Sequence, residues 1–105
     1  MRKTRDPQDP RYREPEPLAF STLCTVLVRG QTFREAGLMN ANFVYYYEDY
    51  EFCLRIRDAG FTIRFVPSVT TWHKVERVTR AGKASPKFWT NYGRSTALFR
   101  RIHGG

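Results

Sequence analysis

Two adjacent carboxylates, Glu48 and Asp49, follow the tyrosines at positions 45–47 and are the clearest candidates for chemistry. A helix over residues 49–60, wound at about 100° per residue, would place Asp49 on the same face as its apolar side chains. An unpaired buried carboxylate is costly, but the free N–H groups and dipole of a helix N-terminus can hold an anion there. Asp49 is therefore a candidate general base, because an inward first-turn position could aim it at a substrate proton. The alternative is that Asp49 only caps its own helix.

The neighbours of this pair suggest a site for a hydroxylic substrate. Tyr46 and Tyr47 offer flat apolar surface with a polar tip, which suits sugar faces as well as protein interfaces. Glu51 stands four residues before Arg55, the favourable order for an ion pair on the outer side of the helix. Arg55 is also a candidate substrate-binding residue. Asp49 and Glu51 do not form an Asp-x-Asp metal pair, because they diverge by about 200° on a helix.

A histidine and a basic segment follow later in the chain. His73 comes directly after Trp72, and its neutral imidazole could ligate a divalent metal or contact a phosphate. Lys74, Arg77 and Arg80 lie in an expected loop over 74–84 and could close over a diphosphate. The alternatives are a surface histidine and an ordinary basic surface loop.

The composition is that of one folded domain. The chain has 105 residues, of which 41% are hydrophobic and 15% aromatic, enough for a modest core. No apolar run approaches the roughly 20 residues that span a bilayer, and the charged N-terminus is not a secretory signal. Cys24 and Cys53 lie in apolar segments, which predicts buried free thiols in a reducing compartment. Without a Cys-x-x-Cys pair, a structural zinc site is not expected.

The net charge of +8 is unevenly distributed. Residues 18–71 are balanced, whereas the segment 72–105 is strongly basic and has Glu76 as its single acidic residue. Such a basic end favours a phosphate-bearing partner, either a nucleotide, a nucleic acid or an anionic membrane surface. A solvated basic face is the alternative.

The order of patterns predicts an α/β domain. Residues 1–17 are rich in proline and charge and are expected to be an irregular lead or linker. The domain proper is expected over 18–102, with a tail over 103–105. The apolar run 22–28 is typical of a strand covered on both faces. Further extended chain is expected over 43–47, with strands over 61–66 and 69–73. Helices are expected over 31–36, 49–60 and 86–102. Gly37 and Gly60 would close the first two helices, and Ser85 and Pro86 would start the third.

The order of these features resembles the C-terminal part of the catalytic domain of glycosyltransferase family 2. These are inverting, nucleotide-sugar-dependent enzymes of the GT-A fold, which is Rossmann-like with a mixed sheet and flanking helices. The closest likeness is to the rhamnosyltransferase-like branch that builds bacterial surface polysaccharides, and it covers about residues 18–102. The segments that carry it are Leu27-Val28-Arg29, Phe33-Arg34-Glu35-Ala36-Gly37-Leu38, Phe43, Tyr46 to Arg55, Asp58-Ala59-Gly60-Phe61, Val66-Pro67 and Trp72-His73-Lys74.

The resemblance implies a role for each matching residue. Asp49 looks like the catalytic base that deprotonates the acceptor hydroxyl, and Glu48 like its usual partner. His73 matches a histidine that helps hold the metal or the donor diphosphate, and the basic loop after it resembles the segment that closes over the donor. The implied cofactor is a divalent cation, Mg²⁺ or Mn²⁺. The implied partners are a nucleotide-sugar donor and a glycan or lipid-linked acceptor, in the cytoplasm or at the inner face of the membrane.

One departure from the family is large. The nucleotide-binding half of the domain, with its Asp-x-Asp motif at a strand end, is not among these residues. We therefore expect the 105 residues alone not to transfer sugar, and expect exposed sheet edges that invite self-association. An excised piece, a truncated gene product and a subunit completed by another chain all remain open.

Two other functions remain open at this stage. A nucleic-acid-binding module fits the sequence pI of about 10.0 and the aromatic residues between basic ones in the last third of the chain. A non-catalytic interaction domain would use the final helix against a membrane or a partner. Both predict that Asp49 can be replaced without effect, whereas a transferase requires it.

Overall fold

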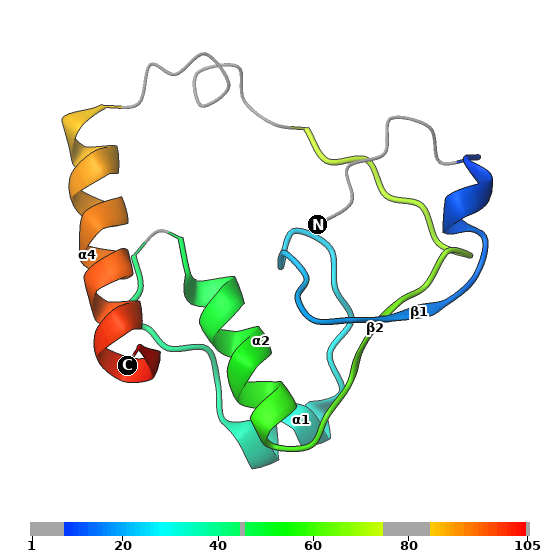
Figure 1. Cartoon of the computed structure of the whole chain (residues 1–105), viewed down its shortest axis with the longest axis horizontal. Coiled ribbons are helices and arrows are strands. Elements are labelled where there is room, and N and C mark those ends of the chain that lie inside the picture. The colour runs from blue at the N-terminus through cyan, green and yellow to red at the C-terminus, as the bar shows by residue number, and fades with distance from the viewer. Residues whose placement is uncertain (1–7, 45, 75–84, 105) are drawn as a thin grey trace.

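The computed structural model describes residues 8–44, 46–74 and 85–104 (Figure 1). It is a small α/β arrangement of helices with a two-stranded antiparallel sheet. In Figure 1, α2 stands at the centre, α4 lies on one side of it, and β1 and β2 lie on the other. In chain order the elements are η1 (Pro10–Tyr12), β1 (Glu16–Leu18), α1 (Gly30–Ala36), α2 (Glu48–Asp58), β2 (Ile63–Phe65) and α4 (Pro86–His103).

The sheet pairs a strand near the start of the described residues with the strand that follows α2. β1 and β2 pair antiparallel, with Leu18 opposite Ile63 and Pro17 opposite Arg64. Both strands are edges, so the missing N–H of a proline is tolerated there. The strand expected over 61–66 is confirmed in part of its range. The expectation that residues 1–17 are irregular is wrong for their later part, which contains η1 and the start of β1.

Glycines end the first two helices as their spacing predicts. The N–H of Gly37 donates to the Phe33 carbonyl at 2.9 Å, and Gly37 has a φ of 85°, which disfavours other residues. After α2, Gly60 has a φ of 92° and its N–H donates to the Arg57 carbonyl at 2.9 Å. Both turns reverse the chain so that α1 and β2 lie against α2.

The last helix begins at the residues that the sequence predicts. Ser85 is its N-cap, and the Ser85 hydroxyl accepts a hydrogen bond from the Phe88 N–H at 3.2 Å. Pro86 occupies the first helical position, where its missing N–H costs nothing. In the part of the chain that the structure describes, no helix is long and apolar enough to cross a membrane.

The core lies between α2, α1 and β2. Its buried residues are Phe52, Cys53, Ile56 and Ile63, and Phe52 is 1% exposed. The Phe33 ring of α1 stacks on Phe52 with the ring centroids 5.6 Å apart. The helix therefore buries an apolar face, as predicted, and Ala59, directly after its last residue, is exposed.

Two predicted strands are wrong. Residues 22–28 form turns and irregular chain, and Leu27 is 99% exposed. Residues 69–73 are likewise irregular, and all are exposed. A continuous apolar run indicates a strand only where neighbours cover both of its faces, and the described residues provide no such cover. The predicted burial of Cys24 fails for the same reason, because its thiol is exposed.

The two cysteines should therefore react at different rates. Burial raises the pKa of the Cys53 thiol, and the negative charge of Asp49 adds to this effect. Because a thiol reacts as its thiolate, we expect Cys24 to be labelled rapidly by a disulfide reagent and Cys53 only after unfolding. As the pH rises through the ordinary thiol range, the unfolded chain loses the Cys53 proton first, so stability should fall. Equal labelling rates in the native protein would contradict the buried position of Cys53.

Candidate functional site

A strained tyrosine turn precedes the acidic pair. Tyr46 and Tyr47 have φ values of 65° and 66°, in the left-handed region that costs about 1 kcal/mol for a residue with a side chain. Tyr47 is the N-cap of α2 and makes no side-chain capping hydrogen bond. The prediction of extended chain over 43–47 is therefore wrong for these two residues. Unfavourable backbone of this kind persists where surrounding contacts hold it, and it clusters at functional sites.

Aromatic packing against α4 holds this turn. The Tyr46 ring lies 5.2 Å from the Phe88 ring and 5.4 Å from the Tyr92 ring, measured between centroids. Tyr47 lies 5.2 Å from Phe99 in the same way. The face of the last helix that packs here carries Phe88, Tyr92 and Phe99. Edge-to-face and tilted ring pairs contribute about 1 kcal/mol each beyond area burial, enough to offset the strain of the turn.

The hydroxyl groups of this cluster are also paired. Hydrogen bonds with Tyr92 and then with Thr96 lower the pKa of the Tyr47 phenol. The same pairing raises the pKa of Tyr92, as expected when one phenol donates to the other. The Tyr47 ring therefore packs on α4, and its hydroxyl interacts electrostatically with Tyr92.

Asp49 lies in the first turn of α2, partly exposed. Its Oδ1 atom accepts a hydrogen bond from the Tyr50 N–H at 2.8 Å. This bond to the helix's own backbone agrees with the capping alternative. Among the described residues, Oδ2 of Asp49 accepts no hydrogen bond, so one carboxylate oxygen is held by the helix and the other is available to a ligand.

Glu48 is placed differently from Asp49. Its Oε2 atom is buried, and within the described parts of the chain it has no hydrogen-bond partner. An unsatisfied buried carboxylate oxygen costs about 1–3 kcal/mol. Both residues are partly exposed, but only Glu48 has a buried oxygen without a partner among the described residues.

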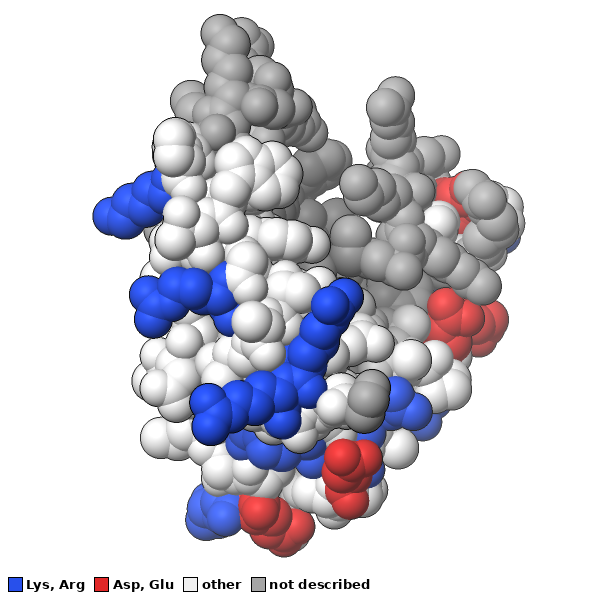
Figure 2. Space-filling view, turned by 60° about the vertical axis from the view of Figure 1, so that its left-hand side comes forward, with Lys and Arg blue, Asp and Glu red and all other residues white. Residues whose placement is uncertain are grey.

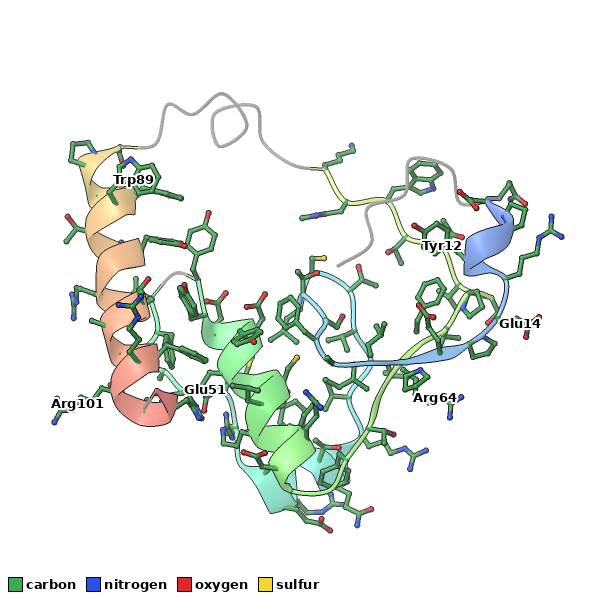
Figure 3. The ribbon with its side chains drawn as sticks, in the orientation of Figure 1. Tyr12, Glu14, Glu51, Arg64, Trp89 and Arg101 are labelled. Atoms are coloured by element: carbon green, nitrogen blue, oxygen red, sulfur yellow. The ribbon has the colours of Figure 1, made fainter. Side chains whose placement is uncertain are left out.

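Glu51 joins α2 to α4 and is the residue that the sequence pattern misplaced. The pattern put Glu51 on the outer side of the helix, but it is 3% exposed. Its Oε1 atom lies 2.9 Å from Arg55 Nε, which confirms the predicted ion pair. It also lies 3.5 Å from His103 Nε2 at the end of α4. Figure 3 shows Glu51 on the side of α2 that faces α4.

Arg55 binds the end of α1 and the following loop as well. Its guanidinium donates to the carbonyls of Ala36 and Leu38, the latter at 2.9 Å, and to both oxygens of Glu51. The guanidinium also lies over the Phe52 ring, 5.3 Å from its centroid. Every one of these contacts is structural. They fix α1 and the loop against the helix that carries Asp49, and the role of Arg55 in substrate binding stays a prediction.

Only two of the predicted donor-side residues, His73 and Lys74, lie among the described residues. His73 and Lys74 are exposed, and Arg77 and Arg80 lie outside the described residues. Among the residues described, no three His, Cys, Asp or Glu side chains come together as a metal-binding group. His73 has no such neighbours within those residues, and its role in holding a metal stays a prediction.

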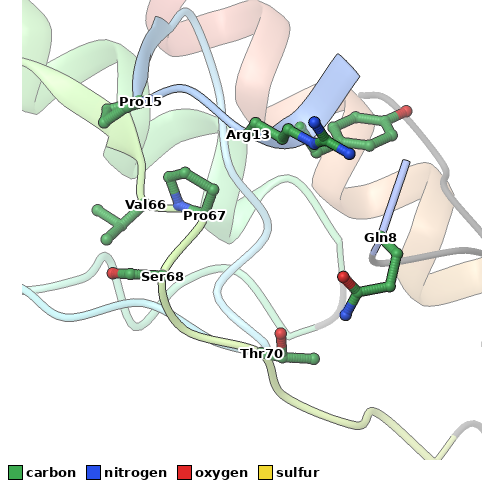
Figure 4. A pocket seen from close by; sticks show the side chains of 8 residues that line it. Gln8, Arg13, Pro15, Val66, Pro67, Ser68 and Thr70 are labelled. Carbon is green, nitrogen blue, oxygen red and sulfur yellow. The ribbon is translucent and has the colours of Figure 1, made fainter. Parts of the chain in front are cut away.

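Two hollows lie away from the acidic pair. One of about 550 Å³ is lined by η1 and the segment after β2, with Gln8, Arg13 and Thr70 around it (Figure 4). The other, of about 370 Å³, lies between the exposed segment 26–29 and β2. Neither is lined by a predicted catalytic or binding residue. The acidic pair, at the N-terminal end of α2, lies outside both hollows.

Comparisons of the chain with family models, with curated proteins and with solved structures find no match.

Proposed function

We propose that this chain is the acceptor-side part of an inverting glycosyltransferase of family 2, with Asp49 as the general base. The helices α1 and α2 and the strand β2 would belong to the C-terminal portion of its GT-A fold. The reaction would take place in the cytoplasm, at or near the inner face of the membrane. The proposal rests on the resemblance of the motifs and on the position of Asp49.

The observation that carries the proposal is the placement of Asp49 beside a strained aromatic turn. The Tyr50 N–H holds one of its oxygens at 2.8 Å, which leaves Oδ2 for a substrate hydroxyl. Tyr46, three residues earlier in the chain, is 41% exposed and offers part of an aromatic ring. A sugar needs both a flat apolar contact and a polar partner for its hydroxyls, and this part of the chain supplies both.

The proposed step moves one proton and exchanges one bond. As the acceptor oxygen attacks the anomeric carbon, its proton passes to Oδ2 of Asp49. The bond from the anomeric carbon to the diphosphate breaks at the same time, and the leaving diphosphate takes the electron pair. In-line attack of this kind inverts the anomeric centre. A base positioned in this way contributes about 10²–10⁴-fold to the rate.

The other residues then take distinct roles. Arg55 is a positioning residue, because its contacts fix α1 and the loop against α2. Lys74, Arg77 and Arg80 are the proposed contacts of the leaving diphosphate, whose charge basic groups would stabilise. Glu48 would remain the partner of Asp49 in the acidic pair.

Donor binding is proposed to need further residues. The 105 residues contain no Asp-x-Asp sequence, and His73 lacks co-ligands among the described residues. The Mg²⁺ or Mn²⁺ ion and the nucleotide would thus be bound largely by a donor-side half. The chain alone is proposed to bind an acceptor without transferring sugar.

Acceptor binding can be tested on the 105 residues as they are. In an NMR titration with a panel of oligosaccharides, we expect the largest amide shifts at Tyr46, Asp49 and Tyr50. The Tyr46→Ala variant should lose most of these shifts, because it removes the exposed ring while leaving the carboxylate. Trp72→Ala, which removes an exposed aromatic side chain elsewhere, is the matched control. Shifts confined to the hollow around Gln8 and Thr70, or none with any glycan, would count against the proposal.

A further inference from the structure

The side of α4 that faces away from α2 is basic. We call this surface the α4 outer face. Helix α4 contains no Asp or Glu, and in the described chain none of its Lys or Arg side chains forms an ion pair. The exposed residues that define the face are Lys87, Trp89, Thr90, Gly93, Arg94, Ala97, Arg100 and Arg101.

The opposite face of α4 is already fully used. Asn91 and Ser95 are buried at 8% and 3% exposure. Phe88 and Phe99 pack on the tyrosine turn, and His103 contacts Glu51. The helix is therefore fixed in orientation, and the outer face is presented as a rigid convex ridge. It is not free to turn inward and bury its charges.

The charges on the outer face follow a definite pattern. At about 100° per residue, Thr90, Gly93 and Ala97 lie at the centre of the face. One margin carries Lys87, Arg94 and Arg101, and the other carries Arg100 beside Trp89. The basic residues extend from position 87 to position 101, about 21 Å along the helix. Figure 2, turned toward α4, shows Lys and Arg spread over the front, with Asp and Glu confined to its lower and right-hand margins.

We propose that the α4 outer face docks α4 lengthwise on an anionic lipid surface. Small residues at the centre let the helix approach a plane closely, and marginal Lys and Arg side chains can reach lipid phosphates on either side. Trp89, 59% exposed, is suited to the headgroup region, where an aromatic ring with a polar N–H is favoured. This inference concerns a surface separate from Asp49 and does not depend on sugar transfer.

A nucleic acid fits the same face less well. Side chains that read base edges are mostly amides, hydroxyls and guanidinium groups directed into a groove. On α4 the amide of Asn91 and the hydroxyl of Ser95 point inward, where both residues are buried. The outer face also has an exposed tryptophan at one end instead of a row of stacking platforms. Charge complementarity with a flat phosphate-bearing surface is the better match.

The test uses the whole chain and sedimentation with lipid vesicles. We expect binding to phosphatidylcholine vesicles that contain about one third phosphatidylglycerol, with weakening as salt shortens the screening length. Each Lys or Arg near such a surface contributes about 1 kcal/mol, so the Arg94→Gln, Arg101→Gln double variant should bind about thirtyfold more weakly. The Arg34→Gln, Arg64→Gln double variant removes the same charge from exposed positions elsewhere and should bind nearly as the parent does.

Tryptophan fluorescence locates the contact. In a Trp72→Phe background, the emission of Trp89 should shift to the blue when anionic vesicles are added. Equal binding to pure phosphatidylcholine, equal losses in the two double variants, or no shift of Trp89 would each overturn the proposal. Tighter binding to RNA than to vesicles at the same phosphate concentration would also overturn it, in favour of a nucleic-acid surface.

Discussion

The Asp49→Asn variant should lose about a thousandfold in kcat for sugar transfer when the chain acts together with a donor-side half. The amide has nearly the shape of the carboxylate and can still accept a hydrogen bond from the Tyr50 N–H. It cannot take the proton of the acceptor hydroxyl, and a positioned base contributes about 10²–10⁴-fold. Donor affinity, measured by calorimetry with the nucleotide sugar, should change little.

The matched control is Asp58→Asn at the other end of α2. Asp58 is an exposed carboxylate on the same helix, so its loss changes the net charge equally. We expect this variant to keep nearly all of the activity. A similar small loss in both variants would mean that Asp49 serves the helix N-terminus alone.

The second large effect is on stability. Arg55→Ala should lower the free energy of unfolding by about 3 kcal/mol, the lower end of the cost of breaking a buried ion pair. Its side chain is 26% exposed and that of Glu51 only 4%, so the variant leaves Glu51 as a buried charge. It also leaves the carbonyls of Ala36 and Leu38 without their guanidinium donor. Urea denaturation followed by circular dichroism measures the change.

Arg57→Ala provides the comparison for Arg55→Ala. Arg57 is exposed and makes one hydrogen bond, at 3.3 Å, to the Ala19 carbonyl. Removing an exposed contact of this kind costs less than about 1 kcal/mol. If both variants lowered stability equally, the network around Glu51 would not be what holds α1 against α2.

Local signals in the sequence predicted the helices well. Gly37, Gly60, Ser85 and Pro86 act through their own backbone and neighbouring carbonyls, so no distant residue is needed to interpret them. The strand expected over 22–28 failed because burial of a strand depends on neighbours that a sequence pattern does not show. β1 was missed because proline normally argues against a strand, and a two-stranded sheet is the case in which it is tolerated.

The candidate site was predictable only in part. The acidic pair could be found from its spacing, and the ion pair between Glu51 and Arg55 from the four-residue separation. The burial of Glu51 could not be predicted, because it depends on the packing of α4 against α2. His103 of α4, which contacts Glu51, lies 52 positions later in the chain. The left-handed turn at Tyr46 and Tyr47 gave no signal, since tyrosine is not a residue that favours a positive φ.

The most direct test of the proposed function is the transfer of labelled sugar from a nucleotide sugar to an acceptor. It should be measured for the chain alone, for the chain with a donor-side half, and for the same pair carrying Asp49→Asn. We expect transfer only by the complete pair with Asp49 intact. Turnover by the 105 residues alone, or transfer by the pair that is indifferent to Asp49→Asn, would contradict the account.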